Sequence, residues 1–253
     1  MSQPWEIYDT LLDGLPDDVV VRTAGQGPRW SRVLNSAGGV GTAWTMDVRS
    51  RPALSGDGPL DGRPLRDVGA LAKSWNLAEA SIGQAAINSW YSREQTAAAN
   101  GFEPTGEGLT WRQVFDPYRE MIVGKKVAVI GHFPFAEAAL AGAGEYICLE
   151  RNLQPGDWPD SACEYVLPEC DLVFISSSSF VNKTAPRLIE LSRQAHTVLV
   201  GPSTPLNPVL LDYGVDTITG FVAASSLSDP TSLAEMVPAG DIGPGFRVHR
   251  HRA

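Results

Sequence analysis

The sequence predicts an α/β protein in two parts: an α+β layer pair followed by a doubly wound, mainly parallel sheet. Four apolar runs of Val, Ile and Leu indicate the sheet, at 126–131, 146–150, 171–176 and 197–201. Continuous apolar runs of this length are typical of strands that are covered on both faces, as in a parallel sheet. Helix-like segments alternate with these runs, whereas the first part of the chain has short strands followed by helices.

The first 95 residues are expected to form the α+β part. Apolar residues at helical spacing predict three helices, at 5–15, 64–75 and 77–90. Three short strands are expected between the first two helices, at 18–22, 29–35 and 40–45. Strands joined by short glycine-rich turns favour an antiparallel meander.

Residues 96–123 are expected to be a linker that ends in a short helix, because they are polar and contain several Gly and Pro. A ligand-binding domain is expected at 124–253, with helical segments at 136–143, 184–195, 205–213 and 229–236. Right-handed crossovers turn this pattern into a doubly wound sheet. A further strand is expected at 217–222, and the tail beyond Pro238 is expected to be mobile at its end.

The composition excludes some classes of partner. A net charge of −9 and a pI of about 4.9 argue against a broad nucleic-acid surface, which is normally basic. No apolar run approaches the length of a membrane span, and no charged-then-apolar leader opens the chain. We therefore expect a cytoplasmic protein without a membrane partner, and a homo-oligomer is left open.

The cysteines and histidines do not predict a metal site. The sequence has three cysteines, Cys148, Cys163 and Cys170, which are expected to be reduced structural thiols. Their spacings, and those of the histidines, supply no closed set of four ligands, so no structural metal is expected. His196 begins a strand and is expected to be structural. His249 and His251 lie in the tail, and two tail histidines do not make a site.

Ligands of parallel sheets bind at the carboxyl ends of the strands, which here carry small and polar residues. The first turn has Gly131 but no G-x-G-x-x-G pattern, and Phe133 stands where a glycine would admit a pyrophosphate, so no dinucleotide is expected. Glu150 ends the next strand, where a carboxylate can accept hydrogen bonds from ribose hydroxyls; it could equally be solvated or pair with Arg151. A nucleoside-like ligand such as S-adenosylmethionine is compatible with this pair of features.

The next two strand ends supply more candidate ligand-binding residues. They are Ser177, Ser178, Asn182 and Thr184 after one strand, and Gly201, Pro202, Ser203 and Thr204 after the other. These residues offer donors and acceptors to a small polar ligand, and a helix beginning at Thr184 would favour an anion. Ser, Asn and Thr are also the residues that ordinary turns prefer, which is the alternative.

Three residues are candidates for catalysis. His132 lies at the sheet rim and is the best histidine for acid–base work, although a single histidine is more often packed or solvated. Lys183 lies in the polar loop of the third strand end. Asn88 lies near the end of a helix of small residues, where it could contact a ligand in a cleft or be an ordinary helix-end residue. No nucleophile–base pair stands out, so the reaction type is not predicted.

Several short motifs resemble a bacterial and archaeal family of domains of unknown function that is associated with heavy-metal chelation. In the first part they are Gly62-Arg-Pro-Leu65 and Gly83-Gln-Ala-Ala-Ile-Asn88. In the second part they are Val129-Ile-Gly-His-Phe133, Glu150 with Pro155-Gly-Asp157, Asp171 with Asn182-Lys-Thr184, and Gly201-Pro202 with Pro205. Their order and spacing extend the resemblance over nearly the whole chain.

The resemblance implies a domain like the N-terminal domain of enolase, joined to a Rossmann-like domain, with the site in the cleft between them. It adds Asp157 to the candidate ligand-binding residues. The family's link to metals does not require the protein itself to hold one. The chain departs from the family at its serine tract, where relatives often carry a Thr-Gly or similar pair.

The leading functional hypothesis is an enzyme that acts on a small polar metabolite in the inter-domain cleft, in the biosynthesis of a metal chelator, cofactor or natural product. Transfer, condensation and hydrolysis are all left open as reactions. One alternative is a non-catalytic binding protein for a chelator or a metal-loaded small molecule. Another is an S-adenosylmethionine-dependent transferase, in which Glu150 holds the cofactor; the cofactor is otherwise unknown.

Overall fold

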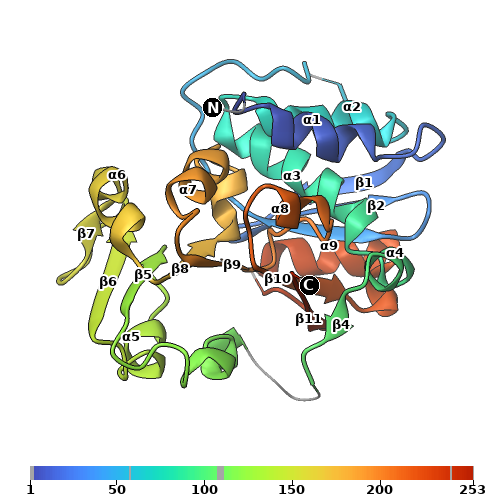
Figure 1. Cartoon of the computed structure of the whole chain (residues 1–253). Coiled ribbons are helices and arrows are strands. Elements are labelled where there is room, and N and C mark those ends of the chain that lie inside the picture. The colour runs from blue at the N-terminus through green and yellow to red at the C-terminus, as the bar shows by residue number, and fades with distance from the viewer. Residues whose placement is uncertain (1–2, 57, 107–110, 240, 253) are drawn as a thin grey trace.

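The computed structural model describes residues 3–56, 58–106, 111–239 and 241–252. The chain forms two sheets (Figure 1). The smaller is antiparallel with the order β1-β2-β3, and the larger has eight strands in the order β4-β11-β10-β9-β8-β5-β6-β7. Strands β10, β9, β8, β5, β6 and β7 are parallel to one another, while β11 pairs antiparallel with β10 and β4 pairs antiparallel with β11. The predicted fold class is confirmed.

The strands are β1 Val21–Gln26, β2 Trp30–Asn35, β3 Val40–Trp44, β4 Glu103–Pro104, β5 Lys126–Ile130, β6 Glu145–Glu150, β7 Trp158–Pro159, β8 Leu172–Ser176, β9 His196–Val200, β10 Thr217–Ala223 and β11 Gly245–His251. The α-helices are α1 Glu6–Asp13, α2 Leu65–Ala70, α3 Leu77–Tyr91, α4 Glu94–Ala99, α5 Ala136–Ala139, α6 Cys163–Val166, α7 Ala185–Leu191, α8 Val209–Asp212 and α9 Pro230–Ala239. Within the described residues, no helix is both long enough and apolar enough to cross a membrane.

Helix α3 is the central element of the first part and is buried along nearly its whole length. The Asn76 side chain caps it by accepting a hydrogen bond from the Glu79 amide at 3.2 Å. Glycines allow its close packing: a Cβ on Gly83 would lie 2.0 Å from the Ala72 nitrogen, and a Cβ on Gly41 would lie 1.9 Å from the Ala85 oxygen. The small residues of α3 therefore determine how closely β3 and the α2 segment approach it.

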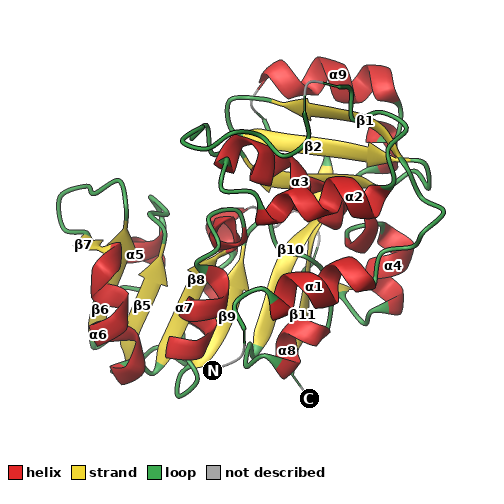
Figure 2. Ribbon diagram, turned by 90° about the horizontal axis from the view of Figure 1, so that it is seen from above, coloured by secondary structure: helices red, strands yellow, loops and turns green. Residues whose placement is uncertain are grey.

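The two parts share one continuous hydrophobic core, which includes residues of α1, α3, β8 and β9. The Tyr8 hydroxyl donates to the Phe180 carbonyl at 2.7 Å, and the Trp44 amide donates to the Ser203 hydroxyl at 2.8 Å. Helix α9, late in the sequence, covers the outer face of β1 and β2 (Figure 2). The first part therefore packs against the β8–β10 region of the large sheet.

Residues 96–106 of the predicted linker are packed against the large sheet. They contain the end of α4 and all of β4, and β4 pairs with β11. The Asn100 side chain donates to the Leu206 carbonyl at 2.9 Å, and Phe102 is buried. The predicted short helix of residues 111–122 is instead two 3-10 turns, at Trp111–Gln113 and Asp116–Tyr118.

The expectation of a mobile tail beyond Pro238 is wrong for residues 245–251, which form β11 and pair with β10 along its whole length. Phe246 and Val248 pack against the core, while polar residues alternate with them on the other face. The glycines and prolines before this strand made its alternation of apolar and polar residues hard to recognise in the sequence. The predicted helix at 205–213 is also shorter, since α8 spans only Val209–Asp212.

We predict that Gly83→Ala lowers the free energy of unfolding by about 2 kcal/mol or more, because the new Cβ collides with the backbone at Ala72. Urea unfolding followed by circular dichroism measures this. Gly142→Ala is the matched control, since its Cβ would meet nothing closer than 3.9 Å and should change stability by less than about 0.5 kcal/mol. Equal effects of the two substitutions would contradict the close packing of α3.

Candidate metal centre

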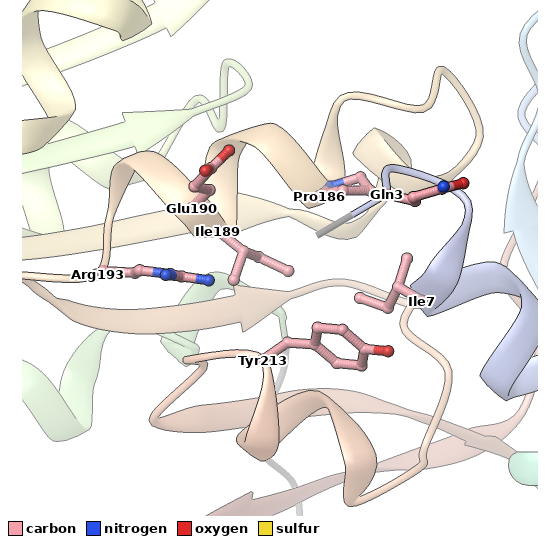
Figure 3. Close-up of a pocket in the computed structure, with 7 residues that line it drawn as sticks. All are labelled: Gln3, Ile7, Pro186, Ile189, Glu190, Arg193 and Tyr213. Atoms are coloured by element: carbon pink, nitrogen blue, oxygen red, sulfur yellow. The ribbon is translucent and has the colours of Figure 1, made fainter. Parts of the chain in front are cut away.

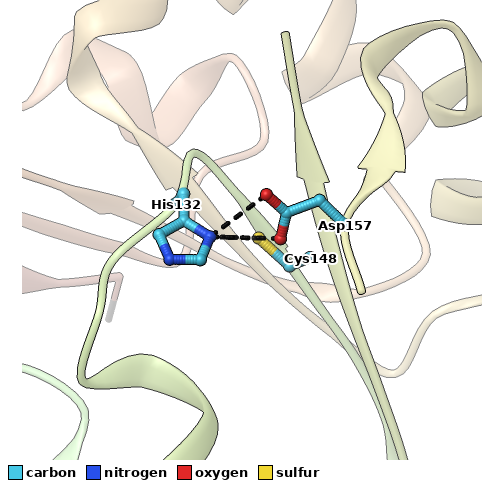
Figure 4. Close-up of side chains that lie close together, drawn as sticks. All are labelled: His132, Cys148 and Asp157. Carbon is cyan, nitrogen blue, oxygen red and sulfur yellow. Dashed lines mark hydrogen bonds and ion pairs between the residues drawn. The ribbon is translucent and has the colours of Figure 1, made fainter. Parts of the chain in front are cut away.

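His132, Cys148 and Asp157 come together at the end of the large sheet that is formed by β5, β6 and β7 (Figure 4). The His132 Nδ1 atom lies 3.1 Å from each carboxylate oxygen of Asp157 and 3.9 Å from the Cys148 sulfur. One ligand atom from each side chain lies within 4.8 Å of the others. We call these three residues the triad.

The pairing of neighbouring strands brings the triad together. Cys148 pairs with Val129 of β5, so its side chain lies just below the turn that carries His132. Leu149 pairs with Trp158 of β7, which brings Asp157, the residue before Trp158, level with Cys148. Gly131 begins the turn with a φ of 98°, and a Cβ there would lie 2.9 Å from that of Ser176. Glycine therefore lets the turn bend tightly past β8.

Glu150 fixes the loops around the triad. One of its oxygens accepts a hydrogen bond from the His132 amide at 2.8 Å, and the other accepts from the amides of Arg151 and Asn152 at 2.6 and 3.1 Å. Asp157 accepts from the Gln154 amide at 2.9 Å. Both carboxylates are thus bound to main-chain donors, which holds His132 and Asp157 in place.

The triad is largely shielded from solvent. The side chain of Asp157 is 4% exposed and that of His132 is 27% exposed, and Cys148 is buried. Burial, followed by the nearby Asp157 and Glu150, raises the pKa of Cys148 to about 12. Burial would also raise the pKa of Asp157, but hydrogen bonds from Gln154, Cys148 and His132 outweigh it and lower that pKa. The metal-free triad therefore holds a thiol beside a carboxylate.

The donor set of the triad suits a transition-metal ion. Thiolate, imidazole and carboxylate are the ligand types of Zn²⁺, at bond lengths of roughly 2.0–2.3 Å. Tetrahedral coordination at these lengths separates donor atoms by roughly 3.3–3.7 Å. The observed separations of 3.1 and 3.9 Å bracket that range, so small side-chain shifts would complete the geometry. Three protein donors leave a fourth position for another ligand.

Of the predicted site residues, Gly131, His132, Glu150 and Asp157 gather at the triad. Phe133 is their neighbour in sequence, but its ring packs edge-on against Phe115 at 5.7 Å between ring centres and belongs to a core cluster. Cys148 is the member of the triad that the sequence analysis missed. Its signal was its place inside a strand, two residues before Glu150.

The serine-rich loop forms a second group, beside the Gly131 turn. The hydroxyls of Ser176 and Ser178 lie 3.0 Å apart, and Ser177 is buried. The Asn182 side chain accepts from the amide and the hydroxyl of Thr184, which forms a local turn. The polar atoms of this loop therefore mainly stabilise its own turns.

Lys183 follows that turn with a φ of 66°, which is uncommon for a residue other than glycine. Its ammonium donates to the carbonyls of Ser74 and Val181 and lies 5.5 Å from the centre of the Trp75 ring. Burial lowers the pKa of Lys183 to about 8, with Glu79 opposing the shift. The residue therefore ties the loop after β8 to the first part of the chain.

The remaining predicted residues lie where the two parts of the chain meet. Ser203 accepts from the Trp44 amide, and the Thr204 hydroxyl lies 2.7 and 2.9 Å from the carbonyls of Gly201 and Thr219. Pro202, between Gly201 and Ser203, is half-buried in the same turn.

Asn88 is completely buried. Its side chain donates to the Thr42 carbonyl at 2.8 Å and accepts from Gln84, so both partners lie in the first part of the chain. Residues predicted to line one cleft are thus divided between the triad and the contact with α3. The strand order explains this, because β5–β7 lie at the end of the sheet away from α1–α3 (Figure 2).

Two surface pockets lie apart from the triad. The first, of about 300 Å³, lies between α1, α7 and Tyr213 and is lined by Ile7, Ile189 and Arg193 (Figure 3). The second, of about 470 Å³, lies under the loop before α2, where Glu79 accepts hydrogen bonds from the amides of Leu54 and Ser55. Neither pocket contains a predicted site residue.

We predict that Lys183 makes stability depend on pH. The folded protein releases this proton near pH 8 and the unfolded chain near 10.5, so the unfolded state binds more protons between these values. The contribution of Lys183 to stability therefore rises with pH across that window. From pH 7 to 10 the wild type should gain about 2 kcal/mol relative to Lys183→Met in urea unfolding. Lys125→Met, at an exposed lysine, is the charge-matched control, and parallel profiles for wild type and Lys183→Met would contradict the assignment.

Comparisons with known proteins place the chain in a family. Two family models, each described as "Putative heavy-metal chelation", match it: DUF4213 over residues 8–91 and DUF364 over residues 113–247. No curated protein matches the chain.

Two crystal structures of proteins of unknown function from the DUF364 family are similar to it. One, from Desulfitobacterium hafniense, is 36% identical, with a TM-score of 0.85 and 98% of each chain covered. The other, from Pyrococcus horikoshii, is 21% identical, with a TM-score of 0.78, and covers 98% of this chain and 99% of its own; it shows the shared fold alone. The chain belongs to the DUF364 family, whose model is described as "Putative heavy-metal chelation" and whose activity is not established.

Proposed function

We propose that the protein binds a thiophilic divalent metal ion through His132, Cys148 and Asp157 and holds it for a small polar ligand. The observation that supports this proposal is the convergence of three different donor atoms within 4.8 Å, at the carboxyl ends of parallel strands. The description of the family agrees with it. It corresponds to the sequence hypothesis of a binding protein for a chelator or a metal-loaded small molecule.

The single thiolate decides which metals fit best. Soft thiolate ligands select ions such as Zn²⁺ and Cd²⁺, while Mg²⁺ and Ca²⁺ prefer sets of oxygen ligands. One sulfur, one nitrogen and one oxygen form a mixed ligand set that is intermediate between soft and hard. The fourth position is open to a donor atom of a small ligand, such as a carboxylate or an amine of a chelator.

Metal titration tests this proposal. The wild-type protein should bind one Zn²⁺ or Cd²⁺ at the triad, and Cd²⁺ should produce a thiolate charge-transfer band in the ultraviolet. Cys148→Ala should abolish the band and weaken binding by at least about 100-fold, since even outer partners of metal ligands contribute 10- to 100-fold.

Cys163→Ala is the control for Cys148→Ala, because Cys163 is also buried but lies in α6 outside the triad. It should leave the charge-transfer band and the affinity unchanged. A band that survives Cys148→Ala, or one that depends on Cys163, would contradict the proposed site.

A metal-dependent hydrolase is the second candidate, and it retains the enzyme hypothesis. The observation that favours it is the donor count: catalytic zinc sites keep three protein ligands and an open position, where bound water loses a proton near neutral pH. The protein would supply the site and its shielding. Zn²⁺-dependent hydrolysis of p-nitrophenyl acetate that is lost in Asp157→Asn would support this reading, and hydrolysis equal to that of free Zn²⁺ would exclude it for this substrate.

The S-adenosylmethionine-dependent transferase stays a prediction. It depends on Glu150, whose two oxygens accept three main-chain hydrogen bonds. Ribose hydroxyls would have to use the remaining lone pairs of these oxygens.

A further inference from the structure

Three of the four histidines of the chain lie on β9 and β11 of the large sheet, away from the β5–β7 strands that form the triad. His196 begins β9, and His249 and His251 lie on β11. Strand pairing places Thr217, the first residue of β10, between them. It pairs with His251 on β11 and with Val198, two residues after His196, on β9. The tail that was expected to carry no site therefore presents two histidines from a fixed strand.

His249 and His251 are separated by one residue on β11, so their side chains project from the same face of the sheet. Their ring centres are 4.8 Å apart and the ring planes are inclined by 60°. The Nδ1 atom of His251 is fixed 3.0 Å from the Thr217 hydroxyl. Glu103 of β4 pairs with His249, which brings a carboxylate to the same face.

The separation of the two rings matches that of two ligands on one metal ion. An imidazole nitrogen binds at roughly 2.0–2.1 Å, which puts the ring centre roughly 3.2 Å from the metal. Two such rings at angles between a right angle and the tetrahedral angle have centres roughly 4.5–5.2 Å apart. The observed 4.8 Å lies within this range.

Unpaired nitrogens in the same cluster indicate that a partner is missing. The Nδ1 atom of His249 and the Nε2 atom of His196 are buried and have no hydrogen-bond partner within the described part of the chain. Burying such atoms without a hydrogen bond costs free energy, so each is expected to bind a partner.

Neutral imidazoles with free lone pairs are the form that binds metal ions. The unpaired Nδ1 atom of His249 offers such a lone pair.

We propose that His249 and His251 form a second metal site that takes Cu²⁺ or Ni²⁺. The set contains two imidazoles, and imidazole nitrogens suit Cu²⁺ and Ni²⁺. It has no thiolate, so it should bind Cd²⁺ weakly compared with the triad. The proposal does not depend on the triad, because the two sites share no residue.

Nickel titration of untagged protein carrying Cys148→Ala isolates the second site. This protein should bind one Ni²⁺ by calorimetry, and adding His249→Gln or His251→Gln should each weaken binding by about 100-fold. Arg250→Gln is the control, because Arg250 lies between the two histidines on the opposite face of β11, where its side chain donates to the Asn100 carbonyl. It should change the affinity by less than about threefold.

Affinity that is the same in both histidine variants and in Cys148→Ala alone would overturn the proposal, as would the absence of Ni²⁺ binding. Thermal melting of each variant establishes that it is folded. If a histidine variant does not fold, electron paramagnetic resonance of Cu²⁺ bound to the Cys148→Ala protein decides the question. Hyperfine coupling to two imidazole nitrogens is expected, and a spectrum with fewer than two imidazole nitrogens would overturn the proposal.

Discussion

Parallel pairing of β5 with β6, and of β6 with β7, sets the positions on which the candidate chemistry depends. The register fixes Val129 opposite Cys148 and Leu149 opposite Trp158, so a buried sulfur lies between the turn of His132 and the loop of Asp157. A shift by one residue would turn Cys148 to the other face of the sheet. Because both faces of this sheet are covered, such a shift would also exchange the side chains packed in the two core layers, and the packing of those layers thereby preserves the triad.

Much of the fold could be predicted, because strands buried on both faces leave a clear pattern. The runs ending at Gly131, Glu150, Ser176 and Gly201 correspond to β5, β6, β8 and β9. Strand β11 could not be predicted in the same way, since its apolar residues alternate with charged ones after a segment rich in Gly and Pro. It is stabilised by pairing with β10, a long-range contact that no local pattern shows.

The candidate site was predicted only in part. His132 lies on a loop at a strand end, where polar residues are conspicuous in a sequence, and Asp157 was added by the family resemblance. Cys148 lies inside a strand, and whether it faces core or loop depends on register and on the neighbouring strand. Asn88 and Ser203 were placed at a ligand because they are polar, but their hydrogen bonds join α3, β3 and the turn after β9. In a buried helix of small residues, polar side chains are needed for such contacts.

Two metal sites with different donor atoms on one sheet would each prefer metal ions of a different softness. In this proposal the triad contributes a thiolate, whereas the β11 site offers imidazole alone. X-ray absorption spectroscopy of the protein loaded with one equivalent of Zn²⁺ tests the central claim most directly. We expect one sulfur at about 2.3 Å with the remaining ligands nitrogen or oxygen at about 2.0 Å. A first shell without sulfur, or with more than one sulfur, would contradict the triad as the metal centre.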